Sequence, residues 1–150
     1  REKVASDELE LYANVFRNSG EEIIVTDRDN RIVAVNPAFT RNTGYTLADV
    51  RGENPKQLSS GHTPRETYRT LWACLNETGF WQGELSDRRK DGTVYPKWAS
   101  ISVIRDEHGE VTHHIASFTD ISERKAAEER IHQLAHHDAL TGLLNRFSLE

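Results

Sequence analysis

Residues 80–125 have the sequence FWQGELSDRRKDGTVYPKWASISVIRDEHGEVTHHIASFTDISERK, and this stretch decides the fold. It predicts three consecutive antiparallel strands followed by the start of a helix. The first strand ends at the turn Lys90-Asp91-Gly92, because Asp-Gly tolerates the positive φ angles that tight hairpins need. The second strand, over residues 93–104, is rich in β-branched and aromatic residues. A polar turn then leads into a third strand over residues 111–119.

The composition is that of one modest domain with extensions. The chain has 150 residues, of which 36% are hydrophobic and 29% charged, and its net charge is −5. Because no basic block occurs, we expect no nucleic-acid partner. The single cysteine, Cys74, cannot form an intrachain disulfide, so we expect a reducing, cytoplasmic location. The sequence contains no long apolar run and no signal peptide, so we expect no membrane segment in it. The absence of methionine indicates a piece of a longer protein.

The N-terminal part predicts a helix and a hairpin. Residues 1–18 have apolar side chains at helical spacing, and Gly20 is a plausible stop. This amphipathic helix can either face the core or form a dimer, and the pattern does not distinguish the two. Two short strands follow, over residues 22–26 and 32–35, joined by a polar turn.

Three capping signals predict the helices between these strands and residue 80. Asn36 is the expected N-cap of a helix that begins at Pro37. Thr46 and Asp49 form a capping pair for a further short helix. In residues 63–66, TPRE, we expect Thr63 to be the N-cap, with proline at the first helical position and a capping-box glutamate. This last helix is the longest of the three and is expected to end at residue 78.

The end of the chain predicts a second long helix, over about residues 122–139, that is dense in charge. Its apolar residues make a weak heptad seam, which suits a short dimeric linker. The order of elements is helix, two strands, several helices, three strands, helix. This order predicts an α+β domain in which five antiparallel strands carry helices on one face. A hollow between sheet and helices is a usual place for a small ligand.

Several motifs resemble those of a PAS domain. They are NPAF at residues 36–39, TGYT at 43–46, RRKDG at 88–92 and DISERK at 120–125. The resemblance implies the PAS fold, with a five-stranded sheet in the order 2-1-5-4-3. It also implies a sensory or dimerisation role and no catalysis by this part of the chain, and we expect a homodimer through the terminal helices.

The C-terminal run HHDALTGLLNR, residues 136–146, resembles the opening of a GGDEF domain, the diguanylate cyclase module that makes cyclic di-GMP from two GTP. The chain ends before the residues that would carry that chemistry, so the resemblance implies a sensor and linker whose cyclase domain follows in the parent protein. We therefore divide the chain into an N-terminal helix, a PAS domain, a helical linker and the start of a GGDEF domain, at residues 1–20, 21–121, 122–137 and 138–150.

Trp72 and Asp87 are the first candidates for ligand binding. Trp72 is on the apolar stripe of the helix that follows residue 63, and Asp87 shares a strand face with Trp81 and Leu85. An ionised carboxylate on an inward face needs a partner. Asn54 is a third candidate, in a loop that faces the pocket of the family.

Each candidate also has a structural interpretation that the sequence leaves open. Trp72 can be core packing, and Asp87 can lie at the strand end, paired with Arg88, Arg89 or water. Asn54 can be a turn-former before a proline.

Flavin-binding PAS domains of the nitrogen-fixation redox-regulator type resemble residues 63–72 and the RRKD run. They carry a tryptophan and an asparagine where this chain has Trp72 and Asp87, and they use them to hold the isoalloxazine ring. The resemblance implies FAD as cofactor and redox sensing as function. Aspartate lacks the amide donor of asparagine and adds a charge, which argues against flavin. A PAS domain without ligand, used only for protein–protein contact, is the remaining alternative.

Other chemistries find less support in the sequence. Light-sensing PAS relatives carry a reactive cysteine where this chain has Pro55, so we expect no flavin–cysteine adduct. His62 is poorly placed to ligate haem, and His132 with the histidine four residues later lacks the further ligands of a zinc site. His113 and His114 must point to opposite faces of the last strand, so one of them faces inward.

Overall fold

The computed structural model describes residues 2–148, and it describes the side chains of residues 4–135. The helices and strands follow the predicted order. They are α1 (Glu2–Asn18), β1 (Glu22–Asp27), β2 (Ile32–Val35), α2 (Pro37–Thr43), α3 (Leu47–Val50), the 3₁₀ turn η1 (Pro55–Leu58), α4 (Arg65–Glu77), β3 (Phe80–Arg88), β4 (Val94–Arg105), β5 (Val111–Asp120) and α5 (Ser122–Ser148).

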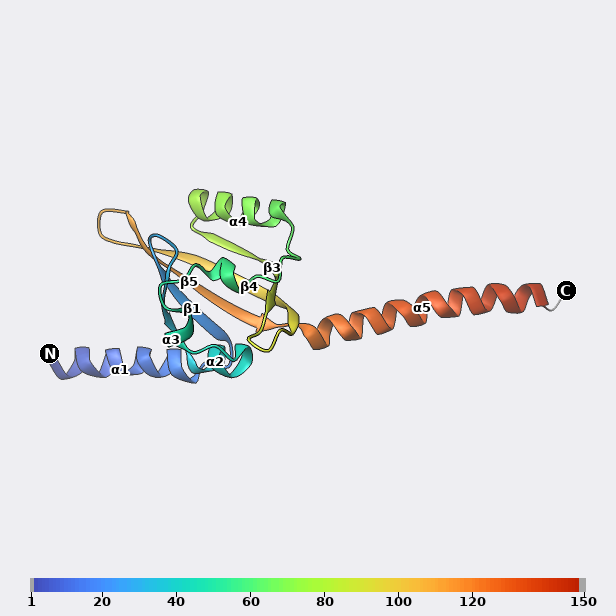
Figure 1. Cartoon of the computed structure of the whole chain (residues 1–150), viewed down its shortest axis with the longest axis horizontal. Helices are drawn as coiled ribbons and strands as arrows, with labels where there is room; N and C mark the ends of the chain where they lie inside the picture. Colours follow the sequence, from blue (N-terminus) through green and yellow to red (C-terminus); the bar gives the residue numbers. More distant parts are fainter. Residues whose placement is uncertain (1, 149–150) are drawn as a thin grey trace. The chain divides into compact units, whose positions relative to one another are not determined.

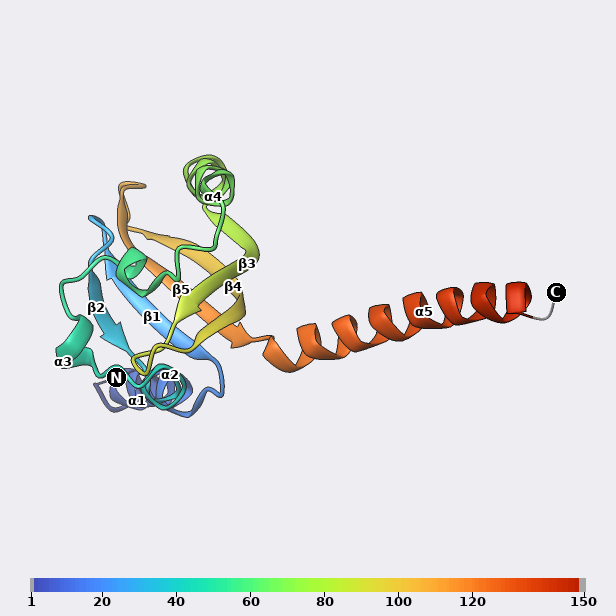
Figure 2. The same cartoon turned by 45° about the vertical axis from the view of Figure 1, so that its right-hand side comes forward.

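The strands form one antiparallel sheet in the order β2-β1-β5-β4-β3, which confirms the predicted topology (Figure 1; β2 is labelled in Figure 2). Strand β3 pairs with β4 and β4 with β5 as consecutive hairpins, and β5 returns to lie beside β1. The segment that contains α2, α3, η1 and α4 joins β2 at one edge to β3 at the other. This crossover carries the helices over the inner face, on which the core residues lie (Figure 2).

Side chains alternate across the sheet as the sequence predicts. On β3, Trp81, Leu85 and Asp87 are buried on the inner face, while Phe80 and Gln82 are exposed. Helix α2 packs against β1, α3 against β2, and α4 against β3 and β4. The resulting core joins the inner face of the sheet to these helices and includes Ile24, Ile32, Phe39, Val50, Leu58, Leu71, Leu75, Trp81, Leu85, Ala99 and Phe118.

Gly83 has no side chain, and this leaves room for the Trp81 indole to lie along β3. A Cβ atom at Gly83 would lie 2.3 Å from Cζ2 of the Trp81 ring, which is too close for both to keep their positions. We expect Gly83→Ala to lower the free energy of unfolding by about 1–3 kcal/mol, because the buried indole must leave its rotamer. Urea denaturation measures this change. Gly20→Ala is the matched control, since its Cβ would meet nothing within 4 Å, and equal effects of the two substitutions would contradict the prediction.

Two of the three predicted capping signals are confirmed. Asn36 caps α2 and accepts from Phe39 N at 3.1 Å, and Thr46 and Asp49 form the reciprocal capping box of α3. The prediction for Thr63 is wrong, because α4 has no side-chain cap. The Thr63 hydroxyl instead accepts a hydrogen bond from Ser86 N at 2.9 Å, which ties the loop before α4 to β3.

Helix α1 leaves most of its apolar side chains in solvent. Leu9 is 69% exposed and Tyr12 is 64% exposed. The C-terminal end of the helix is attached to the domain, because the Asn36 side-chain amide donates to Phe16 O at 3.1 Å. The alternative in which these apolar residues face this domain's own core is therefore wrong.

Helix α5 continues to Ser148 in one piece, past the end near residue 139 that the sequence predicts. A single glycine at position 142 costs a helix only about 1 kcal/mol, so it does not end it. The chain divides into two units, residues 1–120 and 121–150, and α5 belongs to the second. Of the helices in residues 2–148, none is both long and apolar enough to cross a bilayer.

Candidate functional site

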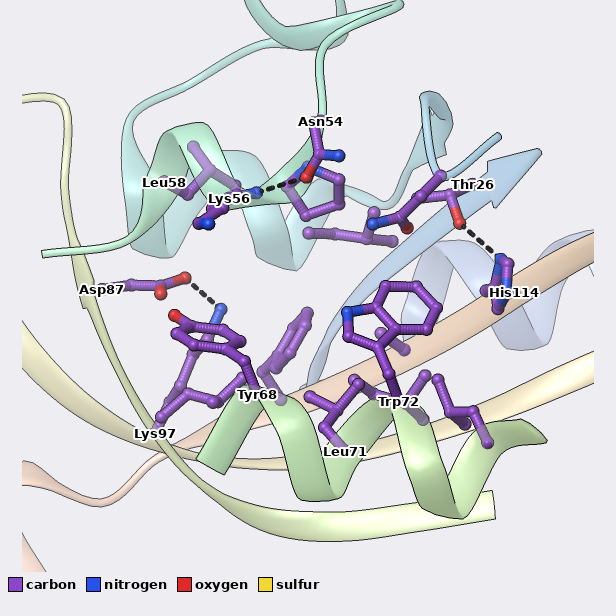
Figure 3. Close-up of a pocket in the computed structure, with 18 of the residues that line it drawn as sticks. Thr26, Asn54, Lys56, Leu58, Tyr68, Leu71, Trp72, Asp87, Lys97 and His114 are labelled. Atoms are coloured by element: carbon purple, nitrogen blue, oxygen red, sulfur yellow. Dashed lines mark hydrogen bonds and ion pairs between the residues drawn. The ribbon is translucent and has the colours of Figure 1, made fainter. Parts of the chain in front are cut away.

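A cavity of about 450 Å³ lies between the inner face of the sheet, α4 and η1 (Figure 3). This volume is in the usual range for small-molecule sites, about 300–1,000 Å³. Aliphatic and aromatic side chains from the sheet and from α4 make most of its wall. The polar and charged residues that line it are Thr26, Asn30, Asn54, Lys56, Tyr68, Arg69, Asp87, Lys97 and His114.

Trp72 projects from α4 into this cavity (Figure 3). Its side chain is 38% exposed, whereas Leu71 and Leu75 on the same helix are 4% and 2% exposed. The indole meets the His114 ring edge-on, with ring centroids 5.7 Å apart. The core-packing interpretation therefore does not describe Trp72, and much of its indole is available to a ligand.

Asp87 lies at one end of the same cavity and forms a buried ion pair with Lys97 of β4 (Figure 3). Its expected partners were Arg88, Arg89 or water, and the two arginines have other partners. Arg88 donates to Gly92 O at 3.0 Å, and Arg89 pairs with Asp120. Asp87 does lie at the end of β3, one residue before Arg88, but its expected partners are wrong, because the carboxylate is buried and its cation comes from the neighbouring strand.

Lys97 is the residue of this site that sequence reasoning missed. A signal for it was present, since Tyr95, Lys97 and Ala99 alternate on one face of β4, and all three are buried. A lysine on an inward face requires a buried partner, and Asp87 on the next strand is that partner. The ammonium also lies 3.5 Å from the centre of the Phe118 ring.

Asn54 lines the cavity and also stabilises the local turn. Its side-chain oxygen accepts from Lys56 N at 2.9 Å and caps η1. The interpretation of Asn54 as a turn-former is therefore correct for its side-chain oxygen. The residue nevertheless borders the cavity that Trp72 and Asp87 border, so all three predicted site residues meet there.

His114, not His113, is the inward-facing histidine of β5, and it lies at the end of the cavity away from Asp87 (Figure 3). Its Nδ1 is 3.3 Å from the Thr26 hydroxyl and 3.2 Å from Asp27 O. A carbonyl oxygen only accepts, so Nδ1 carries the proton if it bonds to Asp27. The arrangement is that of a hydrogen-bonded histidine at the edge of a ligand site.

Glu22 is a second buried carboxylate, with 0% exposure, and it lies opposite Phe118 in the β1–β5 ladder. The Tyr95 hydroxyl donates to its Oε1 at 3.3 Å. Burial raises the pKa of Glu22, while the ammonium of Lys97 and the hydrogen bond from Tyr95 act in the opposite direction. Burial likewise raises the pKa of the Tyr95 hydroxyl, so the phenol remains a donor.

The raised pKa of Glu22 predicts a pH dependence of stability. The folded state holds this proton more tightly than the unfolded state, so stability falls as pH rises from the ordinary pKa of 4.5 through the higher pKa of the folded state. Glu22→Gln removes the ionisable group, so we expect the free energy of unfolding of this variant to decrease less with rising pH than that of the wild type. Urea denaturation at about pH 5 and about pH 8 measures the decrease in each protein. An unchanged pH dependence in the variant would contradict the assignment.

Within the described residues, no group of three or more His, Cys, Asp and Glu side chains could hold a metal ion. The side chain of His136, the second member of the histidine pair considered for zinc, lies outside the described residues.

Comparisons with known proteins define the family. Residues 20–123 match the PAS domain family. A nitrogen fixation regulatory protein of Klebsiella oxytoca is 34% identical over 135 residues, which cover 90% of this chain and 27% of that protein. A blue-light photoreceptor of Listeria monocytogenes is 29% identical over 107 residues, which cover 69% of this chain and 42% of that protein. The structure of an RNA-binding Light-Oxygen-Voltage receptor has a TM-score of 0.76 at 26% identity, and the match covers 85% of this chain and 37% of the receptor chain.

The chain belongs to the PAS domain family. Residues 20–123 are a sensory domain of the kind found in signal-transduction regulators. The chain spans 27% of the length of its Klebsiella relative.

Proposed function

We propose that this PAS domain is the sensory part of a diguanylate cyclase and that its ligand is a flavin, FAD, bound in the cavity beside α4. The observation that carries the proposal is the exposed indole of Trp72 in a cavity that ends in a buried acceptor and a buried donor, Asp87 and Lys97. Similarity to a nitrogen fixation regulatory protein and to a blue-light photoreceptor supports this choice of ligand.

The residues of the cavity fit the isoalloxazine ring. The ring is flat and apolar on both faces, and Trp72 offers it an aromatic surface. Its polar edge is an imide, an N–H between two carbonyl groups, and Asp87 accepts hydrogen bonds while Lys97 donates them. When bound, a flavin supplies reversible electron transfer, which would make the domain a redox sensor. The protein's part is to hold the ring and to limit the access of water.

A titration of the apoprotein with FAD tests the proposal. We expect FAD to bind, its fluorescence to be quenched, and the complex to show a flavin absorbance band at about 450 nm. Trp72→Ala should weaken FAD binding at least about tenfold, because an aromatic contact contributes about 1 kcal/mol or more. Trp98→Ala is the matched control, since Trp98 has the same 38% exposure as Trp72 but does not line the cavity.

Two outcomes would count against a flavin. Absence of any FAD binding would leave the domain as a PAS module for protein–protein contact. Equal weakening by the Trp72 and Trp98 substitutions would mean that FAD binds elsewhere. Mass spectrometry of the denatured, freshly purified protein would then identify any other small ligand.

The cyclase part of the proposal comes from the sequence after β5. Helix α5 begins at Ser122, two residues after the end of β5, and the run at residues 136–146 resembles the opening of a GGDEF domain. The side chains of that run lie outside the described residues. A continuous helix from Ser122 is suited to pass a change in rotation or separation to a following domain.

Insertion of Gly-Gly after Ala126 in the full-length parent tests this linker. We expect the cyclase to lose its response to the state of the sensor, because two flexible residues interrupt the helix. An insertion of seven helix-forming residues is the control, since it preserves the helical phase. A parent that responds equally well with Gly-Gly would refute the rigid-linker idea.

We also propose that the domain forms a homodimer through its terminal helices. Both terminal helices carry large apolar residues that are 64–69% exposed, namely Leu9 and Tyr12 on α1 and Ile131 and Leu134 on α5. Exposed apolar residues grouped in this way indicate an interaction surface. Analytical ultracentrifugation should detect a dimer. The double substitution Leu9→Glu and Tyr12→Glu should shift it to monomer, and a dimer of unchanged stability would exclude α1 from the interface.

A further inference from the structure

The ion pair at the end of the cavity is unusual because it is almost fully buried and faces a ligand site. The side chains of Lys97 and Asp87 are 3% and 9% exposed. Two buried charges are stable only when they are paired and further hydrogen-bonded. The resemblance to flavin-binding PAS domains implies one neutral residue, an asparagine, at the position of Asp87. This chain instead divides the acceptor and the donor between two strands.

The Lys97 ammonium is held in place from several sides. Asp87 pairs with it from β3, and Phe118 of β5 lies beneath it, with the ring centre 3.5 Å from Nζ. Phe118 is the residue directly opposite Glu22 in the β1–β5 ladder, and Lys97 acts electrostatically on Glu22 as well. An ammonium with these neighbours has little freedom to move away from the cavity.

Counting donors and acceptors shows what this pair can still bind. An ammonium has three N–H donors, and the ion pair to Asp87 uses one of them. A carboxylate has about four acceptor positions, so Asp87 can accept from Lys97 and from a ligand at the same time. The pair therefore presents one acceptor and one donor side by side.

The charges also limit the ligand's polar edge. A ligand carboxylate would meet the negative charge of Asp87, and a ligand amine would meet the positive charge of Lys97. A neutral edge with an N–H next to a C=O satisfies both without breaking the ion pair.

We propose that Lys97 is a specificity-determining residue of the flavin site: Asp87 accepts the imide N–H, Lys97 donates to the neighbouring carbonyl oxygen, and the pair selects a neutral N–H/C=O edge. This inference rests on the proposed flavin site. It answers the objection that aspartate lacks the amide donor of asparagine, because the donor comes from β4.

Riboflavin and N3-methylriboflavin test the selection in the complete 150-residue chain, with dissociation constants from fluorescence quenching. Methylation replaces the imide N–H and leaves the rest of the ring unchanged. We expect the wild type to bind the methylated flavin at least about tenfold more weakly, because Asp87 is left without its donor. The apolar variant Asp87→Leu with Lys97→Met should bind the two flavins equally.

A second variant isolates the charge of Lys97. Asp87→Asn with Lys97→Met replaces the ion pair by one amide, which still accepts and donates, so it should still prefer riboflavin. The infrared carbonyl bands of bound riboflavin should lie at lower frequency in the wild type than in this variant, because a charged donor polarises C=O more than an amide does.

The outcomes separate this inference from the proposed function. Absence of binding of both riboflavin and FAD would overturn both. Binding of riboflavin and N3-methylriboflavin with equal affinity would overturn the selection by Asp87 and Lys97 and leave the flavin site intact. Identical carbonyl frequencies in the wild type and in the amide variant would exclude Lys97 as the donor.

Discussion

Lys97→Met is expected to lower the free energy of unfolding by about 3–5 kcal/mol, because it leaves Asp87 as a buried carboxylate without its cation. Both side chains of the pair are nearly inaccessible to bulk solvent, with 3% exposure for Lys97 and 9% for Asp87, so the charge left without its partner is poorly hydrated. Methionine keeps the length and most of the apolar contact of the lysine side chain, so the loss reports the charge and not a cavity. Urea denaturation at neutral pH measures the change.

The double substitution Asp87→Asn with Lys97→Met is the control that identifies the cause. Removal of both charges leaves no uncompensated ion, so the double variant should recover most of the lost stability. The exposed pair between Arg69 and Glu66, with 77% and 75% exposure, provides a second reference. Arg69→Met should change the free energy of unfolding by less than about 1 kcal/mol. A double variant as unstable as Lys97→Met would mean that the loss of stability does not come from the unpaired charge of Asp87.

The pair also illustrates where sequence reasoning succeeds and where it ends. Alternation along residues 80–125 predicts the three strands and the strand face that Asp87 shares with Trp81 and Leu85, because these follow from local periodicity and turn chemistry. The strand order of the whole sheet is implied by the resemblance to PAS domains and not by the alternation. The partner of Asp87 does not follow, since it depends on which residues of two strands stand side by side. In the sheet Asp87 is opposite Tyr95 and Leu85 is opposite Lys97, so the ion pair forms on the diagonal.

Helix α4 shows the same limit in another form. Periodicity predicts an inward-facing stripe, and Leu71 and Leu75 are indeed buried, yet Trp72 faces open space in the cavity. Whether an inward residue meets the core or a cavity depends on the distance between helix and sheet, which the sequence of the helix does not contain. The local pattern likewise predicts Thr63 as the N-cap of α4. Its hydroxyl instead accepts a hydrogen bond from Ser86 N, which is 23 residues away in sequence.

Substitution of Asn36 is expected to cause the second large loss of stability, because this one side chain joins three parts of the fold. It is 1% exposed, and its side-chain oxygen accepts from Ile23 N at 2.9 Å and from Phe39 N at 3.1 Å. Its amide donates to Phe16 O at 3.1 Å and to Glu21 O at 2.9 Å. The residue therefore caps α2 and fastens both the end of α1 and the start of β1.

Asn36→Ala is expected to lower the free energy of unfolding by about 3 kcal/mol or more, because the lost cap costs about 1 kcal/mol and each buried backbone group left unpaired costs about 1–3 kcal/mol. Hydrogen exchange should also locate the loss. The amides of Ile23 and Phe39 should exchange faster than the global decrease in stability requires, and α1 should lose protection near Phe16.

Asn54→Ala is the matched control, since Asn54 is also an N-cap asparagine before a proline but makes only the bond from Lys56 N at 2.9 Å at an exposed position. Its loss should cost no more than about 1 kcal/mol. If the two substitutions cost the same, or if α1 keeps its protection in Asn36→Ala, then Asn36 is only a cap. In that case the attachment of α1 to the domain must come from apolar contact with α2, the helix against which it packs.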